Sequence, residues 1–258
     1  MAGSQTVIEI RQLFQLPEFE EVLRLQQAIW GFADIELLPL RFLVVVSKVG
    51  GHVFGAYDGD MMVGFCFAIP GIKPDGRAYL HSHMLGVLPA YHNAGIGRGL
   101  KLRQRDEALE RGIHLIEWTF DPLELKNAFF NIERLGAIVR RYHENQYGIT
   151  FSPLHGGLPT DRCYAEWWIA SPRVEALVGR TPPGCPLGHP DPLVRPPLGL
   201  QISYPTAIAR LRAEDPRRAR QIQKENGAKF HRAFEQGLAV TRFARGETEG
   251  SYLLEPWE

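Results

Sequence analysis

The sequence has little cysteine and no excess of either charge, and both absences narrow the classes of function. Its 258 residues include three cysteines, Cys66, Cys163 and Cys185, and no two of them have the spacing of a metal-binding or redox pair. We therefore interpret them as reduced structural thiols of a cytoplasmic protein. Basic and acidic residues number 29 each, giving a net charge of zero. An overall field that would attract nucleic acid is therefore not expected.

Long apolar runs are also missing. A membrane-spanning helix needs roughly 18 consecutive apolar residues, and the longest aliphatic run here, Phe42 to Val46, is far shorter. The first residues lack the basic start and apolar stretch of a secretory signal. Apolar residues make up 45% and charged residues 22% of the chain, which is typical of a globular domain. We expect a cytoplasmic protein that binds neither membrane nor nucleic acid.

The pattern of apolar residues predicts a chain in which strands and helices alternate. Two apolar runs around Asp58-Gly59-Asp60 predict a hairpin. Pro17 suits the first turn of a helix that Gly31 ends. The predicted strands are 6–10, 52–57, 61–69, 78–88, 113–120, 137–142 and 163–170, and the predicted helices are 17–30, 39–49, 97–111 and 122–135.

Composition changes after residue 170. Residues 171–205 contain nine prolines, too many for a helix or a central strand. We predict a first domain over 1–172, a proline-rich arm or linker over 173–204, and a C-terminal extension over 205–258. A helix from Asp215-Pro216 to Gly237 and a terminal hairpin are expected in the extension. The extension has few apolar residues for a core of its own, so we expect it to pack on the first domain or on a second copy of the chain in a homodimer.

The strongest chemical signal is a glycine-rich loop between the strand 78–88 and the helix 97–111. Its sequence is His92-Asn93-Ala94-Gly95-Ile96-Gly97-Arg98-Gly99. Glycines let a backbone approach a ligand, and a helix start offers unpaired N–H groups that suit a pyrophosphate. A tight turn with nothing bound is the simpler interpretation. A dinucleotide-binding loop fits less well, because Leu100 stands where its third glycine belongs.

Residues 85–97 resemble the acyl-coenzyme A loop of the GCN5-related N-acetyltransferase (GNAT) superfamily, whose pattern is Arg or Gln, two residues, Gly, one residue, then Gly or Ala. The order of elements over about 6–172 is similar to that family as well. The resemblance implies an α/β (α+β) fold with a mixed, mostly antiparallel sheet, helices on both faces, and a splay between the fourth and fifth strands. It implies cofactor contacts from Leu85, Gly86, Val87, His92, Asn93, Ala94, Gly95, Ile96, Gly97, Arg98 and Asn127.

Two positions depart from the family pattern. His92 replaces the usual Arg or Gln, although most phosphate contacts of the loop come from the backbone. Many members carry a tyrosine four residues before the glycine that ends the next helix, and Ile132 stands there. The usual proton donor to the departing thiolate is therefore missing. Arg98 and Lys101 could add positive charge near the helix start.

Acyl transfer to an amine needs a base, and histidine titrates near neutral pH. His81 falls where some members of the family carry a glutamate base, and we rank His83 second. With a period of two, both would share a face with Leu85 and Val87. Either could instead be an ordinary core or edge histidine. The leaving group could be assisted by Asn127, or by Asp121, Asn131, Tyr142 or Tyr147.

Substrate contacts are expected from Arg140 and Arg141, which could bind a carboxylate, and from Trp30. We predict an N-acyltransferase that moves an acetyl or succinyl group from coenzyme A (CoA) to a small-molecule amine such as an amino acid, without a metal. A CoA-binding module without catalysis and a protein lysine acetyltransferase are the alternatives.

Overall fold

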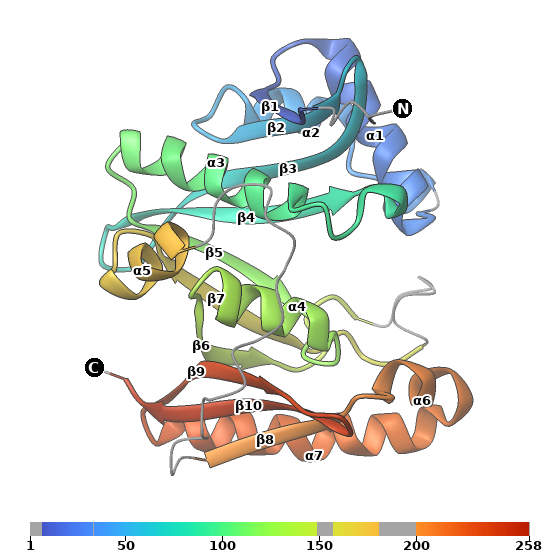
Figure 1. Ribbon diagram of the computed structural model, residues 1–258, viewed down its shortest axis with the longest axis vertical. Coiled ribbons are helices and arrows are strands. Elements are labelled where there is room, and N and C mark those ends of the chain that lie inside the picture. Colours follow the sequence, from blue (N-terminus) through green and yellow to red (C-terminus); the bar gives the residue numbers. More distant parts are fainter. Residues whose placement is uncertain (1–6, 33, 149–156, 181–199, 258) are drawn as a thin grey trace, which may run out of the picture. The chain divides into compact units, whose positions relative to one another are not determined.

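The computed structural model describes residues 7–32, 34–148, 157–180 and 200–257, and the chain divides into two compact units (Figure 1). Unit 1 contains the described residues up to Ile116, and unit 2 contains those from Glu117 onward. The division lies inside the predicted first domain, and the C-terminal elements belong to the same unit as 117–180. The predicted splay concerns the placement of one unit against the other and stays a prediction.

Unit 1 is built on four antiparallel strands in the order β1-β2-β3-β4. The tight turn at Gly59, with φ +58°, produces the predicted β2–β3 hairpin. Gly31 ends α1 in the left-handed conformation, with φ +65°. The elements are β1 (Glu9–Gln12), α1 (Leu16–Trp30), η1 (Asp34–Glu36), α2 (Leu40–Val46), β2 (His52–Asp58), β3 (Met61–Ile72), β4 (Ala78–Val87), η2 (Pro89–Tyr91) and α3 (Ile96–Glu110).

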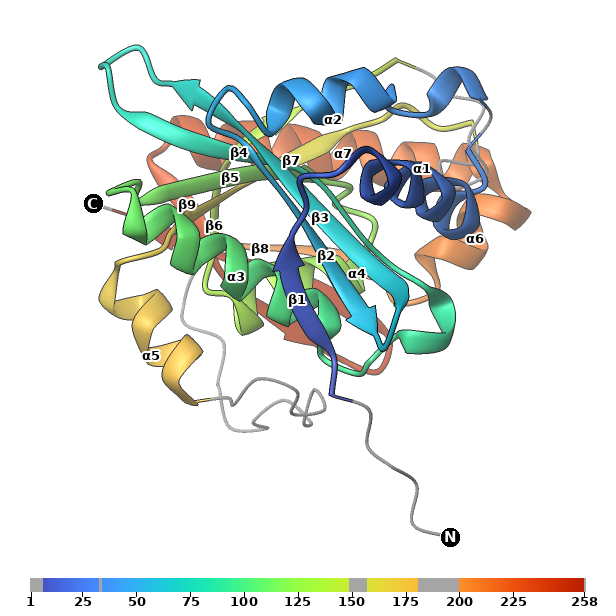
Figure 2. The same ribbon diagram turned by 90° about the horizontal axis from the view of Figure 1, so that it is seen from above.

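Helices cover both faces of this sheet, as predicted (Figure 2). Phe65 and Phe67 of β3 pack with residues of α1 and α2 such as Phe19 and Leu43. Cys66 lies on the other face, where it packs with Leu100 of α3. The alternation of side chains along β3 therefore defines an α1/α2 face and an α3 face.

A β-bulge in β4 shifts this alternation. Phe67 pairs with Met84 and Ala68 pairs with Ser82, so His83 is the extra residue. Odd-numbered side chains of β4 therefore lie on one face of the sheet before the bulge and on the other face after it. Leu85 and Val87 lie on the α3 face with Ser82, whereas His81 pairs with Ile69 on the α1/α2 face.

Unit 2 has the strand order β5-β7-β6-β9-β10-β8, and β5 belongs to it from Glu117 onward. The predicted terminal hairpin is β9–β10, and it extends the sheet from β6, where Val139 pairs with Val240. Phe230 of α7 stacks on Tyr142 of β6 at 5.2 Å between ring centroids. The elements are β5 (Leu115–Phe120), α4 (Leu125–Phe129), η3 (Phe130–Arg134), β6 (Ile138–His143), β7 (Arg162–Trp168), α5 (Pro172–Arg180), β8 (Leu200–Pro205), α6 (Ile208–Glu214), α7 (Pro216–Glu235), β9 (Leu238–Arg245) and β10 (Glu249–Pro256).

Two expectations for unit 2 are corrected. The helix predicted over 122–135 begins at Leu125 and continues as a π-helix, η3. Asp121 caps the turn before it by accepting a hydrogen bond from the Leu123 N–H at 2.8 Å. The segment 173–204 also contains most of α5 and β8. These two elements can contain proline because Pro172 stands at the start of a helix and Pro205 ends an edge strand.

No helix in the described part of the chain has both the length and the apolar character needed to cross a membrane.

Candidate functional site

The glycine-rich loop adopts a geometry that presents the start of α3. Asn93 and Gly95 have φ angles of +65° and +80°, which place both in the left-handed region. Gly95 is the N-cap of α3 and makes no side-chain capping bond. The first N–H groups of a helix have no partner within the helix. The loop therefore offers backbone donors and the positive end of a helix dipole to an anion.

Two side chains at the N-terminal end of the loop hold it to the rest of unit 1. The Tyr91 hydroxyl donates to Asp58 Oδ2 at 2.7 Å. The exposed His92 side chain turns back, and its Nε2 donates to the Val87 carbonyl at 2.9 Å. Val87 is one of the residues expected to pair with the pantetheine arm. A carbonyl has two lone pairs, so this contact stiffens the loop and leaves Val87 one acceptor position.

Two basic side chains near the start of α3 do not face solvent. Arg98 and Lys101 are each 4% exposed. The Lys101 Nζ donates to Ser82 Oγ at 2.8 Å, and that hydroxyl donates to Gln104 Oε1 at 2.9 Å. Burial lowers the pKa of Lys101 to about 7. Neither side chain is exposed at the loop, so backbone donors are what the loop presents to solvent, and the added positive charge of Arg98 and Lys101 stays a prediction.

His81 and His83 lie together on the α1/α2 face, with ring centroids 5.9 Å apart. The His83 ring also packs at 5.4 Å from Phe67. The prediction that the two histidines share a face is confirmed. The prediction that Leu85 and Val87 share it is wrong, because the bulge at His83 changes the phase of the strand. Surrounding protein removes hydration from the His83 imidazole and lowers its pKa.

Trp30 lies on this α1/α2 face as well. It stacks on Phe32 at 5.4 Å and meets Phe65 edge to face at 5.8 Å. A Cβ at residue 86 would lie 2.8 Å from the Trp30 ring, so Gly86 provides the space that the indole needs. Unit 1 thus brings together Trp30, His81 and His83 on one face, beside a row of aromatic rings.

In unit 2, Arg140 and Arg141 bond to two carboxylates inside the sheet. Arg140 Nη2 donates to Glu166 at 2.5 Å, and Arg141 Nη2 donates to Glu117 at 2.7 Å. Glu117 and Glu166 are 2% and 4% exposed. Neither glutamate was predicted, although a single carboxylate within each apolar strand sequence was a usable signal.

The other candidates in unit 2 differ in accessibility. Asn127 is exposed on α4, and Asn131 is buried. Ile132 is fully buried. The buried Tyr142 hydroxyl donates to Asp161 at 2.6 Å, and burial raises the pKa of Tyr142. Tyr147 is 50% exposed, with its hydroxyl 3.1 Å from Thr119 Oγ1. Tyr147 is therefore the accessible phenol of the two that were predicted.

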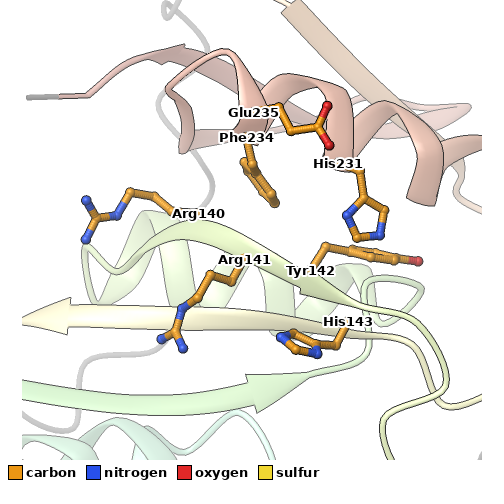
Figure 3. A pocket seen from close by; sticks show the side chains of 7 residues that line it. All are labelled: Arg140, Arg141, Tyr142, His143, His231, Phe234 and Glu235. Atoms are coloured by element: carbon orange, nitrogen blue, oxygen red, sulfur yellow. The ribbon is translucent and has the colours of Figure 1, made fainter. Parts of the chain in front are cut away.

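A shallow pocket of about 290 Å³ opens between β6 and α7 of unit 2 (Figure 3). Phe234 and His231 point from α7 toward β6, and Arg141 extends from β6 toward β7. Its lining consists of Arg140, Arg141, Tyr142, His143, His231, Phe234 and Glu235. Among the described residues, no group of three or more His, Cys, Asp or Glu side chains is arranged to hold a metal ion.

Three solved structures that are similar to this chain bear the name acetyltransferase. A protein from Desulfovibrio desulfuricans assigned to the GNAT family is 18% identical with a TM-score of 0.51, over 64% of this chain and 100% of its own. The ribosomal-protein-S18-alanine N-acetyltransferase of Escherichia coli is 19% identical with a TM-score of 0.50, over 64% and 96%. A Salmonella typhimurium protein solved with its cofactor acetyl-CoA is 18% identical with a TM-score of 0.51, over 64% and 97%.

These likenesses show that the chain has the GNAT fold, which confirms the predicted fold class. No protein-family model and no curated protein sequence matches the chain.

Proposed function

From the GNAT fold, we propose that this chain is an N-acyltransferase that moves an acetyl group from acetyl-CoA to the amine of a small molecule. The observation that carries the proposal is the loop between β4 and α3. Two left-handed residues, Asn93 and Gly95, turn the chain so that the uncapped start of a 15-residue helix is presented to an anion. A pyrophosphate is the anion that CoA brings.

The cofactor would be held mainly by backbone groups. The N–H groups from Asn93 to Arg98 would bind the pyrophosphate, and Leu85, Gly86 and Val87 would pair with the pantetheine arm. Arg98 would contribute its backbone, because its side chain is buried. Asn127 would donate to the thioester carbonyl or to the pantetheine. The donor could also be succinyl-CoA.

The reaction would start when a base takes a proton from the acceptor ammonium group. The neutral amine then attacks the thioester carbonyl carbon, the carbon–sulfur bond breaks to release the CoA thiolate, and the nitrogen loses a second proton, which balances the proton taken up by the thiolate. His81 and His83 are the candidates for the base, and the lowered pKa of His83 keeps its imidazole neutral at pH 7. Trp30 would form part of the acceptor surface on the α1/α2 face.

The thiolate can accept a proton from Tyr147 or leave unassisted, because a thiol has a pKa of only about 8.5. Of the two predicted phenols, Tyr147 is the exposed residue, whereas Tyr142 is buried with its hydroxyl bonded to Asp161. A CoA-binding module without catalysis is the second candidate, and the buried Ile132 favours it because this position supplies no proton donor.

The two candidates are separated by binding and turnover. CoA affinity would be measured by calorimetry, and CoA release would be followed with acetyl-CoA and succinyl-CoA against a panel of amines and amino acids. Binding with turnover supports the transferase. Binding without turnover at high enzyme concentration selects the module, and a chain that binds no CoA contradicts both.

Replacing His81 or His83 by alanine should slow acyl transfer by about 100-fold or more for the residue that acts as base. The dissociation constant for CoA should stay unchanged. His83 has a lowered pKa, so if it is the base, the acid limb of kcat/KM should lie below about pH 6.5. The pH profile and the two single variants would be compared with His114→Ala, which alters an exposed histidine of unit 1. Unchanged rates in both variants would remove these histidines from the mechanism.

A further inference from the structure

The two guanidinium groups of Arg140 and Arg141 are brought to one place by a second β-bulge. Val139 pairs with Ala165 and Arg141 pairs with Tyr164, so Arg140 is the extra residue of β6. A bulge lets neighbouring side chains reach the same side of a sheet. Both arginines consequently reach Glu166, Arg140 through Nη2 at 2.5 Å and Arg141 through Nε at 3.6 Å.

Buried carboxylates fix the orientation of these guanidinium groups. Glu117 and Glu166 lie on β5 and β7 and are almost fully buried, so they cannot follow a moving partner. Arg141 bonds to both of them and stacks on the Tyr164 ring, with its Cζ 4.5 Å from the ring centroid. The arginine side chains remain 42% and 39% exposed. The fold therefore presents two oriented guanidinium groups to solvent.

We propose that Arg140 and Arg141 form a recognition site for a carboxylate of the molecule that takes part in acyl transfer. The proposal rests on the proposed function. A guanidinium group matches a carboxylate because its planar N–H fork donates two parallel hydrogen bonds. The Nε and Nη2 groups of Arg140 and Arg141 already bond to the two glutamates, so a ligand would use the remaining N–H groups of each guanidinium. Holding these groups in place in advance lowers the ordering cost of binding.

The surroundings set the size and strength of this site. Arg140 and Arg141 line the pocket of about 290 Å³ together with Phe234, which offers an apolar wall to a short carbon chain. Other carboxylates are close: Glu235 also lines the pocket, and Glu144 pairs with His231 at 3.6 Å. These charges, with Glu117 and Glu166, cancel much of the positive field. The hydrogen-bonding geometry of the fork, more than net charge, selects the ligand.

The test begins with succinate and succinamide, which share a carbon skeleton and differ in charge. Each would be titrated into the full chain by calorimetry, with and without saturating CoA. Succinate should bind saturably and at least 10-fold more tightly than succinamide. Equal binding of the two compounds, or no binding of succinate, would overturn the proposal. Failure of the proposed function would be seen separately, as the absence of CoA binding and of CoA release.

Variants connect the preference to these residues. Arg141→Gln alone leaves the Glu117 carboxylate buried without its cation, so the double variant Glu117→Gln/Arg141→Gln, which exchanges the ion pair for two amides, is the safer test. It should lose the preference for succinate while keeping its CoA affinity. Arg242→Gln is the matched control, because Arg242 pairs with Glu133 at 3.1 Å and does not line the pocket. A double variant that keeps the preference would contradict the proposal.

The carboxylate could belong to the amine acceptor or to the acyl group of the donor, and binding and rate measurements distinguish the two. If it belongs to the acceptor, amino acids should be acetylated and their amides should react at least 10-fold more slowly. If it belongs to the donor, succinyl-CoA should bind at least 10-fold more tightly than acetyl-CoA, and the double variant should abolish that difference. A double variant with wild-type rates for all four substrates would rule out both sources.

Discussion

Gly97→Glu should abolish CoA binding without unfolding the protein. Gly97 is partly exposed in the first turn of α3, which holds no acidic residue. A Cβ at this position would meet Leu85 Cδ2 at 3.5 Å, an ordinary contact. A carboxylate in the first turn stabilises a helix through its dipole. The same carboxylate would repel the pyrophosphate, so we expect CoA affinity to fall by about 100-fold or more, equivalent to about 2.7 kcal/mol.

The test is specific because the substitution should weaken CoA binding while it maintains or raises the stability of the protein. Calorimetry would report the dissociation constant for CoA, and a melting curve would report a Tm equal to or above that of the unaltered protein. Gly97→Ala is the control, because it adds only the tolerated Cβ and should keep the affinity within a few-fold. Tight CoA binding by Gly97→Glu would mean that the pyrophosphate does not lie at the start of α3.

Lys101→Met should stabilise unit 1 near neutral pH and remove a pH dependence. Lys101 is 4% exposed, and burial lowers its pKa from 10.5 to about 7. Between these values the unfolded chain binds more protons than the folded one, so stability rises with pH through this window. One proton corresponds to a slope of about 1.4 kcal/mol per pH unit. The methionine variant should lack this slope.

Other groups limit the range in which this slope can be measured. Burial raises the pKa of Cys66 from 9.0 to about 12. Its folded form therefore keeps a proton that the unfolded chain loses, and stability falls above pH 9. Denaturant unfolding between pH 7.5 and 8.5 avoids that region. Lys48→Met, at an exposed lysine of unit 1, should leave the slope unchanged. A slope that persists in Lys101→Met would show that another group causes it.

Local sequence rules predicted the elements whose boundaries depend on single residues. Gly31 ends α1, Gly59 allows the β2–β3 hairpin, and Asp215 caps α7 by accepting from the Arg218 N–H at 3.0 Å. Each feature depends on the conformational preference of one residue, so it is readable without a structure. The same is true of the glycine-rich loop.

Features that depend on pairing between strands were not predictable. The bulges at His83 and Arg140 are mismatches between two strands, and a period of two cannot reveal them. The first bulge placed His81 on the face opposite to the expected one. Lys101 was assigned to the helix start because of its position, but its long side chain lies in the interior against Ser82. Tertiary contacts determined these outcomes.

The pairing of β6 with β9 has a consequence for how copies of the chain could associate. An open strand edge presents unpaired backbone groups that invite a strand from another molecule. In unit 2 the chain covers β6 with its own β9, followed by β10 and β8. The outermost strand, β8, is six residues long and ends at Pro205, whose nitrogen cannot donate. The C-terminal extension thus moves the open edge in unit 2 from β6 to a short strand that a proline ends, and it reduces the backbone available for pairing with a second copy.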